Sequence, residues 1–401
     1  NSLIPGKVLR PGHLRPRSPV SSSSGFTRSS HWLCPLVVSD DHTRRGYLTT
    51  PTSRGACVPT QHIPCRRPTQ IPVPGGAAPS PARLTAQHRV PIVDAHVPDI
   101  ARDEVICAVL ALDPDGRRTG AVMRRTFDQI YDGARTGRYK WSHLYKTEKT
   151  HFGTLLEINL QREFGFEDGL KLDYWISGHE VDAKYSQTLW TWMLPPEAVG
   201  ELCLVMSACD NESTYSMGII RASEDFLNRG NNRDSKKTLS ASGRRAVKWI
   251  FDSCPFPPNV LLQLPDTDIE AIFTKRSGQQ RVNELFRRAS GRLVSRAAIE
   301  TVAQQLDPMK RVRANGGARQ ALAAEGVAIF SGDYVWQREA AAALELPVPS
   351  ESQFVSAYLR EAPSGVLIRG TRWTLADSTT ATPIPLAMYA RSPSSAHLSE
   401  V

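Results

Sequence analysis

The stretch LDYWISGHEVDAKY, residues Leu172–Tyr185, has the pattern of a β-hairpin. Two runs that alternate apolar and polar residues flank Ser177-Gly178, a two-residue turn signal. This turn predicts three cross-strand pairs: Ile176 with His179, Trp175 with Glu180, and Tyr174 with Val181. The apolar side chains then share one face of the hairpin, which suits a core: Leu172, Tyr174, Ile176, Val181, Ala183 and Tyr185.

The other face of the predicted hairpin is charged. Asp173 falls opposite Asp182, and Lys184 lies two residues further along the same face. Cross-strand partners have Cβ atoms about 5 Å apart, so the two carboxylates repel each other unless a cation offsets their charge. Asp, spacer, Asp-x-Lys is typical of metal-dependent nucleases that cut phosphodiesters. The alternative is an amphipathic strand edged with solvated charges, because D-x-K tripeptides are common.

The chain has 401 residues, enough for two domains, and a formal net charge of +9. Residues 1–95 hold twelve Lys and Arg against three Asp, whereas the remainder is balanced at 37 basic and 37 acidic side chains. The overall basicity is therefore poor evidence for DNA binding. This Pro- and Ser-rich segment lacks any sustained periodicity, so we expect a disordered tail, and its composition leaves open that it is non-native.

Cysteine usage and hydropathy exclude several classes of protein. The seven cysteines form no CxxC pair, so neither zinc nor a disulfide framework is indicated, which suits a reducing cytoplasm. There is no run of about 18 apolar residues of the kind that spans a membrane.

Residues 96–255 read as an α/β domain in which helices flank a mixed sheet. We predict two helices over 99–131, broken at Asp113–Gly116, and two more over 142–150 and 152–164, the second with Glu157 near its apolar face. Leu202–Ser207 predicts a buried strand, Tyr215–Arg221 a further strand, and 242–251 a short element. Phe256-Pro257-Pro258 is the candidate linker.

Residues 258–378 differ in character. Helices are predicted over 283–289 and 295–304, and Asp307-Pro308 predicts the start of another helix that carries Lys310, Arg311 and Arg313. Between Lys275 and Arg319 eleven basic residues face three acidic ones, which indicates a helix-turn-helix, with wing strands at 327–330 and 372–375. A helical bundle with a solvated basic face is the alternative. Residues 379–401 are predicted to be a disordered tail.

Several long strings together resemble the NaeI-type (Type IIE) restriction endonucleases, from about residue 101 to about 376. They are KTEKTHFGTLLEINLQREF (146–164), DYWISGHEVDAK (173–184), WMLPPE (192–197), RVNELFRR (281–288) and MKRVRANGGAR (309–319). The resemblance implies an endonuclease-type PD-(D/E)xK core followed by a winged-helix (CAP-like) domain. It further implies a homodimer that cleaves double-stranded DNA at a palindrome with Mg²⁺ and is activated by a second DNA copy.

By the same resemblance, Glu157, Asp173, Asp182 and Lys184 are the expected catalytic residues. The expected metal ligands are Glu157, Asp173, Asp182 and the carbonyl of Ala183, and the expected DNA contacts are Lys146, Lys149, Lys310, Arg311, Arg313 and Arg319. The chain departs from the family at Ala183, Tyr185, Gln187–Thr191 and Pro308, which puts the recognised base sequence in doubt. A catalytically silent DNA-binding regulator and a nicking or repair nuclease remain as alternatives.

Overall fold

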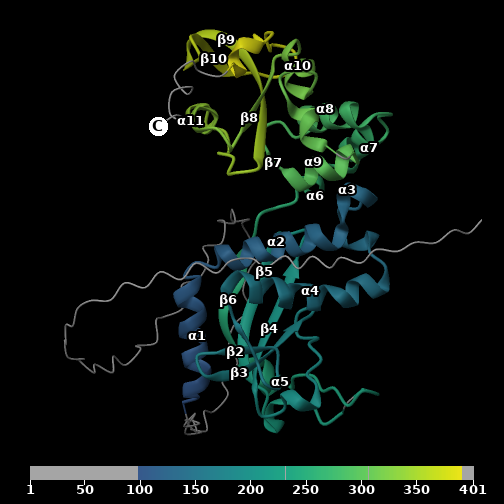
Figure 1. Ribbon diagram of the computed structural model, residues 1–401, viewed down its shortest axis with the longest axis vertical. Coiled ribbons are helices and arrows are strands. Elements are labelled where there is room, and N and C mark those ends of the chain that lie inside the picture. Colours follow the sequence, from purple (N-terminus) through teal and green to yellow (C-terminus); the bar gives the residue numbers. More distant parts are fainter. Residues whose placement is uncertain (1–97, 231, 306, 391–401) are drawn as a thin grey trace, which may run out of the picture. The chain divides into compact units, whose positions relative to one another are not determined.

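The computed structural model describes residues 98–230, 232–305 and 307–390. These residues form a mixed α/β structure with a six-stranded mixed sheet, helices and a second, smaller sheet (Figure 1). The tail predicted over 1–95, and residues 391–401 of the tail predicted over 379–401, lie outside the described residues. No described helix is long and apolar enough to cross a membrane.

The six-stranded sheet follows the order of the sequence, from β1 to β6. Its strands are β1 (Glu167–Asp168), β2 (Tyr174–Ile176), β3 (His179–Tyr185), β4 (Leu202–Cys209), β5 (Thr214–Arg221) and β6 (Lys248–Pro255). Only β3 and β4 are parallel, and the other neighbours are antiparallel. The continuous apolar run of β4 is buried along nearly its whole length, as a central strand requires.

The predicted hairpin is confirmed in its register. Tyr174 pairs with Val181, Trp175 with Glu180, and Ile176 with His179. Ser177 and Gly178 both have positive φ, 51° and 84°, the conformation of a type I′ turn, whose twist matches that of the flanking strands. The turn therefore fixes which side chains of β3 face the core and which face the polar side.

Helices cover the apolar face of this sheet, and α2 and α4 lie side by side (Figure 1). The helices and 3₁₀ turns are α1 (Ile100–Leu112), α2 (Arg117–Tyr131), α3 (Gly133–Thr136), η1 (Trp141–His143), α4 (Lys146–Phe164), η2 (Pro196–Ala198), η3 (Glu224–Phe226) and α5 (Ala241–Ala246). The predicted break at Asp113 is confirmed, since its carboxylate accepts hydrogen bonds from the backbone and hydroxyl of Thr119. The element predicted over 242–251 is instead α5 followed by strand β6.

The prediction of two helices over 142–164 was wrong, because α4 is continuous. Glu148 accepts a hydrogen bond from the backbone of Tyr145 and pairs with Arg138, so it caps the start of the continuous helix. The helix continues through Gly153. A Cβ atom added at this position would lie 3.7 Å from Cβ of Tyr185, which is an ordinary contact.

Both faces of the first sheet are buried. The face under the helices packs α1, α2 and α4 against apolar residues of β2 to β6, including Tyr174, Val181 and Phe251. The other face carries a second cluster, which includes Trp192, Cys203 and Ile220. Because side chains alternate along β3, Val181 and Ala183 join the first cluster while Asp182 and Lys184 point to the opposite side.

The C-terminal part of the chain is built around one long strand. Its elements are α6 (Val260–Gln263), α7 (Asp266–Phe273), α8 (Gly278–Arg288), β7 (Leu293–Ser295), α9 (Arg296–Ala303), η4 (Pro308–Val312), α10 (Ala318–Ala323), β8 (Val327–Ser331), α11 (Val335–Ala343), β9 (Gln353–Ile368), β10 (Thr371–Leu375) and η5 (Leu386–Tyr389). Strand β9 pairs antiparallel with β7, β8 and β10.

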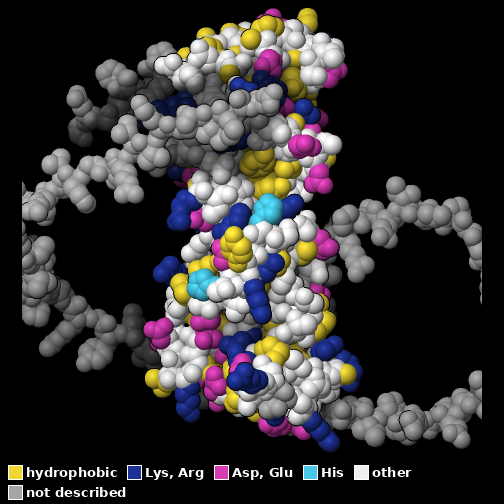
Figure 2. All heavy atoms as spheres, turned by 90° about the vertical axis from the view of Figure 1, so that its right-hand side faces the viewer, with side chains coloured by type: hydrophobic (Ala, Val, Ile, Leu, Met, Phe, Trp, Pro, Cys, Tyr) yellow, Lys and Arg dark blue, Asp and Glu magenta, His cyan; other side chains and the backbone are white. Residues whose placement is uncertain are grey.

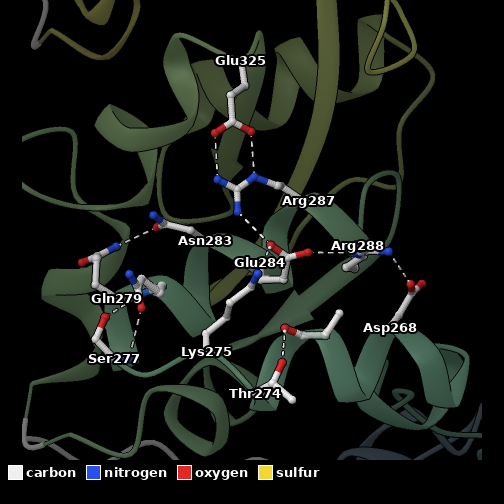
Figure 3. A network of polar contacts seen from close by, with 12 residues as sticks. Asp268, Thr274, Lys275, Ser277, Gln279, Asn283, Glu284, Arg287, Arg288 and Glu325 are labelled. Atoms are coloured by element: carbon white, nitrogen blue, oxygen red, sulfur yellow. Dashed lines mark hydrogen bonds and ion pairs between the residues drawn. The ribbon is translucent and has the colours of Figure 1, made fainter.

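Part of the basic cluster predicted over 275–319 is neutralised internally. Glu284 is 6% exposed and accepts hydrogen bonds from Arg287 and Arg288. Arg287 also makes two 2.7 Å hydrogen bonds to Glu325, and Arg288 bonds Asp268 (Figure 3). These arginines bind acidic side chains within the C-terminal part of the chain. Fewer of the eleven basic side chains are therefore available to a ligand than the sequence count suggests.

Three boundaries predicted in this region need correction. Phe256 is buried in the first core, so the linker begins after it. Asp307 caps as predicted, with its carboxylate accepting from Lys310, but the following turn is a 3₁₀ helix and the next α-helix starts only at Ala318. Residues 379–390 are not a tail, because Ile384 and Met388 are buried in the C-terminal core.

Candidate active site

The polar face of the β2–β3 hairpin brings the predicted acidic residues and lysine together. The Nζ atom of Lys184 lies 2.7 Å from Oδ1 of Asp182 and 3.4 Å from Oδ2 of Asp173. The same ammonium group donates to the carbonyl of Ala183 at 2.9 Å. One cation thus offsets the repulsion between the two carboxylates that the hairpin register imposes.

Asp173 lies just before β2 and is held by the backbone of the opposite strand. Its Oδ2 accepts a 2.7 Å hydrogen bond from the backbone N–H of Ala183. This bond joins the carboxylate of Asp173 to the strand that carries Asp182 and Lys184. The hairpin therefore holds the three side chains in a fixed arrangement.

Glu157 reaches the site from helix α4. Its backbone carbonyl accepts a 2.9 Å hydrogen bond from the Tyr174 hydroxyl, which anchors the helix to the hairpin. The carboxyl group of Glu157 lies close enough to that of Asp173 for their charges to interact. Burial, followed by the charge of Asp173, raises the pKa of Glu157 to about 7. Glu157 therefore exchanges a proton close to neutral pH.

Asp182 is the most buried acid of the group, with 3% of its surface exposed. Burial raises its pKa to about 6, although the charge of Lys184 and the hydrogen bond from it act in the opposite direction. Its Oδ2 is buried and has no hydrogen-bond partner of ordinary geometry among the described residues. A buried carboxylate oxygen without a partner is costly, which is typical of a functional site.

The chemical types of the donors, though not their present spacing, suit a hard divalent cation. Three carboxylates, one with an unused oxygen, and the carbonyl of Ala183 supply the oxygen ligands that Mg²⁺ prefers. In the described part of the chain, no three His, Cys, Asp or Glu side chains converge closely enough to hold an ion. Lys184 instead neutralises both aspartates, so binding of a cation requires its ammonium group to move aside.

The predicted DNA contacts have different surroundings. Lys146 is exposed and Lys149 half-buried at the start of α4, and Lys310 and Arg313 are exposed around η4. Lys310 pairs with Asp307 at 3.1 Å, and Arg311 is half-buried. Arg319 differs from the others.

The guanidinium group of Arg319 is engaged inside the C-terminal region. It donates to the carbonyl of Ile329 and to Oε1 of Gln337, and it stacks on the ring of Tyr389 at 4.9 Å. Burial lowers the pKa of Arg319 from its usual value. The geometry favours a structural role for this residue rather than the phosphate contact that the sequence predicted.

A buried polar network lies beneath α2, and no sequence pattern indicated it. Arg124 lies 2.6 Å from Oδ1 of Asp210, and the Tyr131 hydroxyl donates to Oδ2 of the same carboxylate at 2.6 Å. All three residues are less than 10% exposed. Asp210 follows strand β4 in a turn, where an aspartate is expected for local reasons, so nothing in the sequence signalled its distant partners.

Comparison with known proteins gives the family. The family model described as "Restriction endonuclease NaeI" matches residues 103–381. The chain is also 46% identical over 291 residues to the Type II restriction enzyme NaeI of Lentzea aerocolonigenes, an alignment covering 70% of this chain and 91% of that protein. The matched range includes the hairpin, helix α4 and the whole basic segment. The chain therefore belongs to the NaeI family of restriction endonucleases.

Proposed function

We propose that this chain is a Type II site-specific deoxyribonuclease that hydrolyses both strands of double-stranded DNA at a short palindrome. The observation that carries the proposal is the bridging position of Lys184 between Asp173 and Asp182, beside Glu157. A regulator with an abandoned active site has no reason to keep acidic groups that repel one another in a buried position. Membership of the restriction endonuclease family supports the same conclusion.

Glu157, Asp173, Asp182 and the carbonyl of Ala183 would hold Mg²⁺. When bound, the ion supplies Lewis-acid stabilisation of charge that develops on the phosphate. Lys184 would orient the attacking water and donate hydrogen bonds to the phosphate oxygens as their charge increases. Glu157, whose pKa is about 7, would complete the ligand set in its ionised form. The hairpin and the hydrogen bond from the backbone of Ala183 keep these groups in place.

We further propose that the C-terminal region is a winged-helix module that binds a second DNA copy. The order α8, β7, α9, η4, α10, β8 and β9 supports it, with β9 between β7 and β8 in the sheet. The candidate phosphate contacts are Lys310, Arg311 and Arg313. They lie in η4 or directly after it, and precede α10 in the sequence.

The segment that follows the first predicted wing strand, β8, favours a different role from DNA contact. Residues 332–352, which connect β8 to β9, contain four acidic residues and one basic residue, Arg338. DNA phosphates repel a segment with this excess of negative charge. We therefore expect DNA to approach from η4 rather than from residues 332–352. On the face shown in Figure 2, basic and acidic side chains are interspersed, in agreement with a charge that is balanced outside the first 95 residues.

The test of catalysis is incubation of the purified protein with plasmid DNA and Mg²⁺, followed by sequencing of the fragment ends. We expect double-strand cuts at one palindrome, none in EDTA, and a loss of about 10²–10³ in rate for Lys184→Ala. Lys171→Ala removes a lysine just before the hairpin whose side chain makes no ion pair with Asp173 or Asp182, and is the matched control. Single-strand nicks alone would favour a nicking or repair nuclease, and DNA binding without cuts a regulator.

The second DNA site is tested in the full-length protein. Replacing Lys310, Arg311 and Arg313 by alanine should abolish the acceleration of cleavage that a short cognate duplex produces. The dependence of binding on salt should also fall, by about 0.9 in log–log slope for each phosphate that the variant no longer neutralises. Unchanged acceleration in the triple variant would rule out η4 as the activator site. A homodimer, expected because a palindrome presents two equivalent strands, is checked by sedimentation.

A further inference from the structure

A buried thiol lies behind the acidic group of the site. Strands β3 and β4 are parallel, and Asp182 is the register partner of Cys203 while Lys184 is the partner of Val205. Register partners on neighbouring strands direct their side chains to the same face, with Cβ atoms about 5 Å apart. Cys203 is fully buried and Asp182 is 3% exposed, so both side chains lie away from bulk solvent.

The carboxylate of Asp182 is only half satisfied by the residues around it. Oδ1 accepts from the ammonium group of Lys184 at 2.7 Å, whereas Oδ2 is buried without a partner of ordinary geometry among the described residues. The surrounding cluster is apolar and includes Trp192, Leu194 and Ile220. The thiol of Cys203 is the polar group that β4 presents beside this carboxylate.

We infer that Cys203 is a positioning residue, whose thiol holds the carboxylate of Asp182 in the orientation needed to receive a divalent cation. The inference rests on the proposed nuclease function. An S–H group is a weak and neutral donor, so it orients the carboxylate without neutralising the negative charge that attracts the ion. A group behind a ligand commonly changes metal affinity 10- to 100-fold.

Two substitutions separate hydrogen bonding from packing. Cys203→Ala removes the donor, and Cys203→Ser keeps a donor of similar size. Ile220→Val is the packing control, because Ile220 is the register partner of Cys203 on β5 and belongs to the same apolar cluster without a polar group. The first measurement is Mn²⁺ binding by electron paramagnetic resonance. The second is the rate of a single cleavage turnover at varied Mg²⁺, with DNA binding in EDTA as the check of folding.

We expect Cys203→Ala to weaken Mn²⁺ binding by about tenfold, and to raise the Mg²⁺ concentration for half-maximal cleavage similarly, with DNA binding unchanged. Cys203→Ser should stay within about threefold of the parent protein, and Ile220→Val should match it. Equal Mn²⁺ binding by parent and Cys203→Ala, or equal losses in Cys203→Ala and Ile220→Val, would overturn the inference. If the parent protein binds Mn²⁺ but cuts no DNA, the nuclease proposal fails while the Mn²⁺ comparison still decides the role of Cys203.

Discussion

At the scale of single residues, Asp182 shows how the site trades stability for function. Its carboxylate is buried, faces Asp173 and, among the residues that the structure describes, is compensated through one oxygen by Lys184. In the metal-free protein the ionised form is therefore disfavoured, as the rise of its pKa to about 6 indicates. A cation would remove that penalty, which is the expected behaviour of a site prepared for an ion.

We predict that Asp182→Asn abolishes cleavage yet stabilises the metal-free protein by about 1–3 kcal/mol at about pH 7.5. A folded-state pKa raised from 3.8 to about 6 means that the native protein loses stability as the pH rises through that window. The advantage of the variant should thus shrink as the pH falls from about 6 to about 4. Urea unfolding in EDTA measures it, with the exposed Asp225→Asn as control. A variant less stable than the parent above neutral pH contradicts the electrostatic account.

The pairing of the hairpin could be predicted from the sequence, but the ion pair within it could not. Turn chemistry and alternation fix the register from Leu172 to Tyr185, because both are local properties. The bridging position of Lys184 depends on rotamers that the burial of Asp182 selects. The internal contacts of Arg319 could not be predicted for a related reason, since the partners of its side chain follow it by 10 and 18 positions on other elements.

At the scale of elements, the network of Arg124, Tyr131 and Asp210 joins helix α2 to the turn between β4 and β5. A buried ion pair that loses one partner leaves an uncompensated charge in an apolar environment. The network therefore fixes the helix against the turn at the end of β4.

We predict that Asp210→Ala destabilises the protein by about 3–5 kcal/mol, because the buried Tyr131 hydroxyl loses its acceptor and buried Arg124 keeps only its 3.0 Å ion pair with Asp128. Tyr131→Phe removes only one hydrogen bond and should cost about 1–2 kcal/mol. Urea unfolding followed by circular dichroism gives both values. A loss below about 1 kcal/mol for Asp210→Ala would mean that the existing pair with Asp128 compensates the charge of Arg124 by itself.

Helices and strands with a long periodic pattern were predicted well. Helix boundaries that depend on capping residues were predicted poorly. The separation of α1 from α2 and the buried strand β4 follow from local patterns. The continuity of α4 depends on the cap at Tyr145 and Glu148, and on the contact between Glu148 and Arg138. Helix α10 begins after Gly316 and Gly317, and these glycines separate it from η4.

At the scale of the whole molecule, residues 1–95 carry twelve basic and three acidic side chains, while none of the site residues lies there. We predict that a protein beginning at Val93 cuts the same sequence at the same rate in about 150 mM salt, where screening limits the reach of loose charges to about 8 Å. Low salt should reveal weaker DNA binding. Loss of site-specific cutting, with the circular dichroism spectrum of the remainder intact, would show that the segment is functional.

The long strand β9 also sets an order of assembly as the chain leaves the ribosome. The hairpins of the first sheet join residues that are close in sequence, such as Tyr174 and Val181. Strand β7 must wait for β9, because Leu293 pairs with Val355. Contacts of such sequence separation form slowly, and until then the edges of β7 and β8 offer their backbone groups to other chains. A nascent or truncated protein that ends before Gln353 should consequently be prone to aggregation, with the nuclease half already folded.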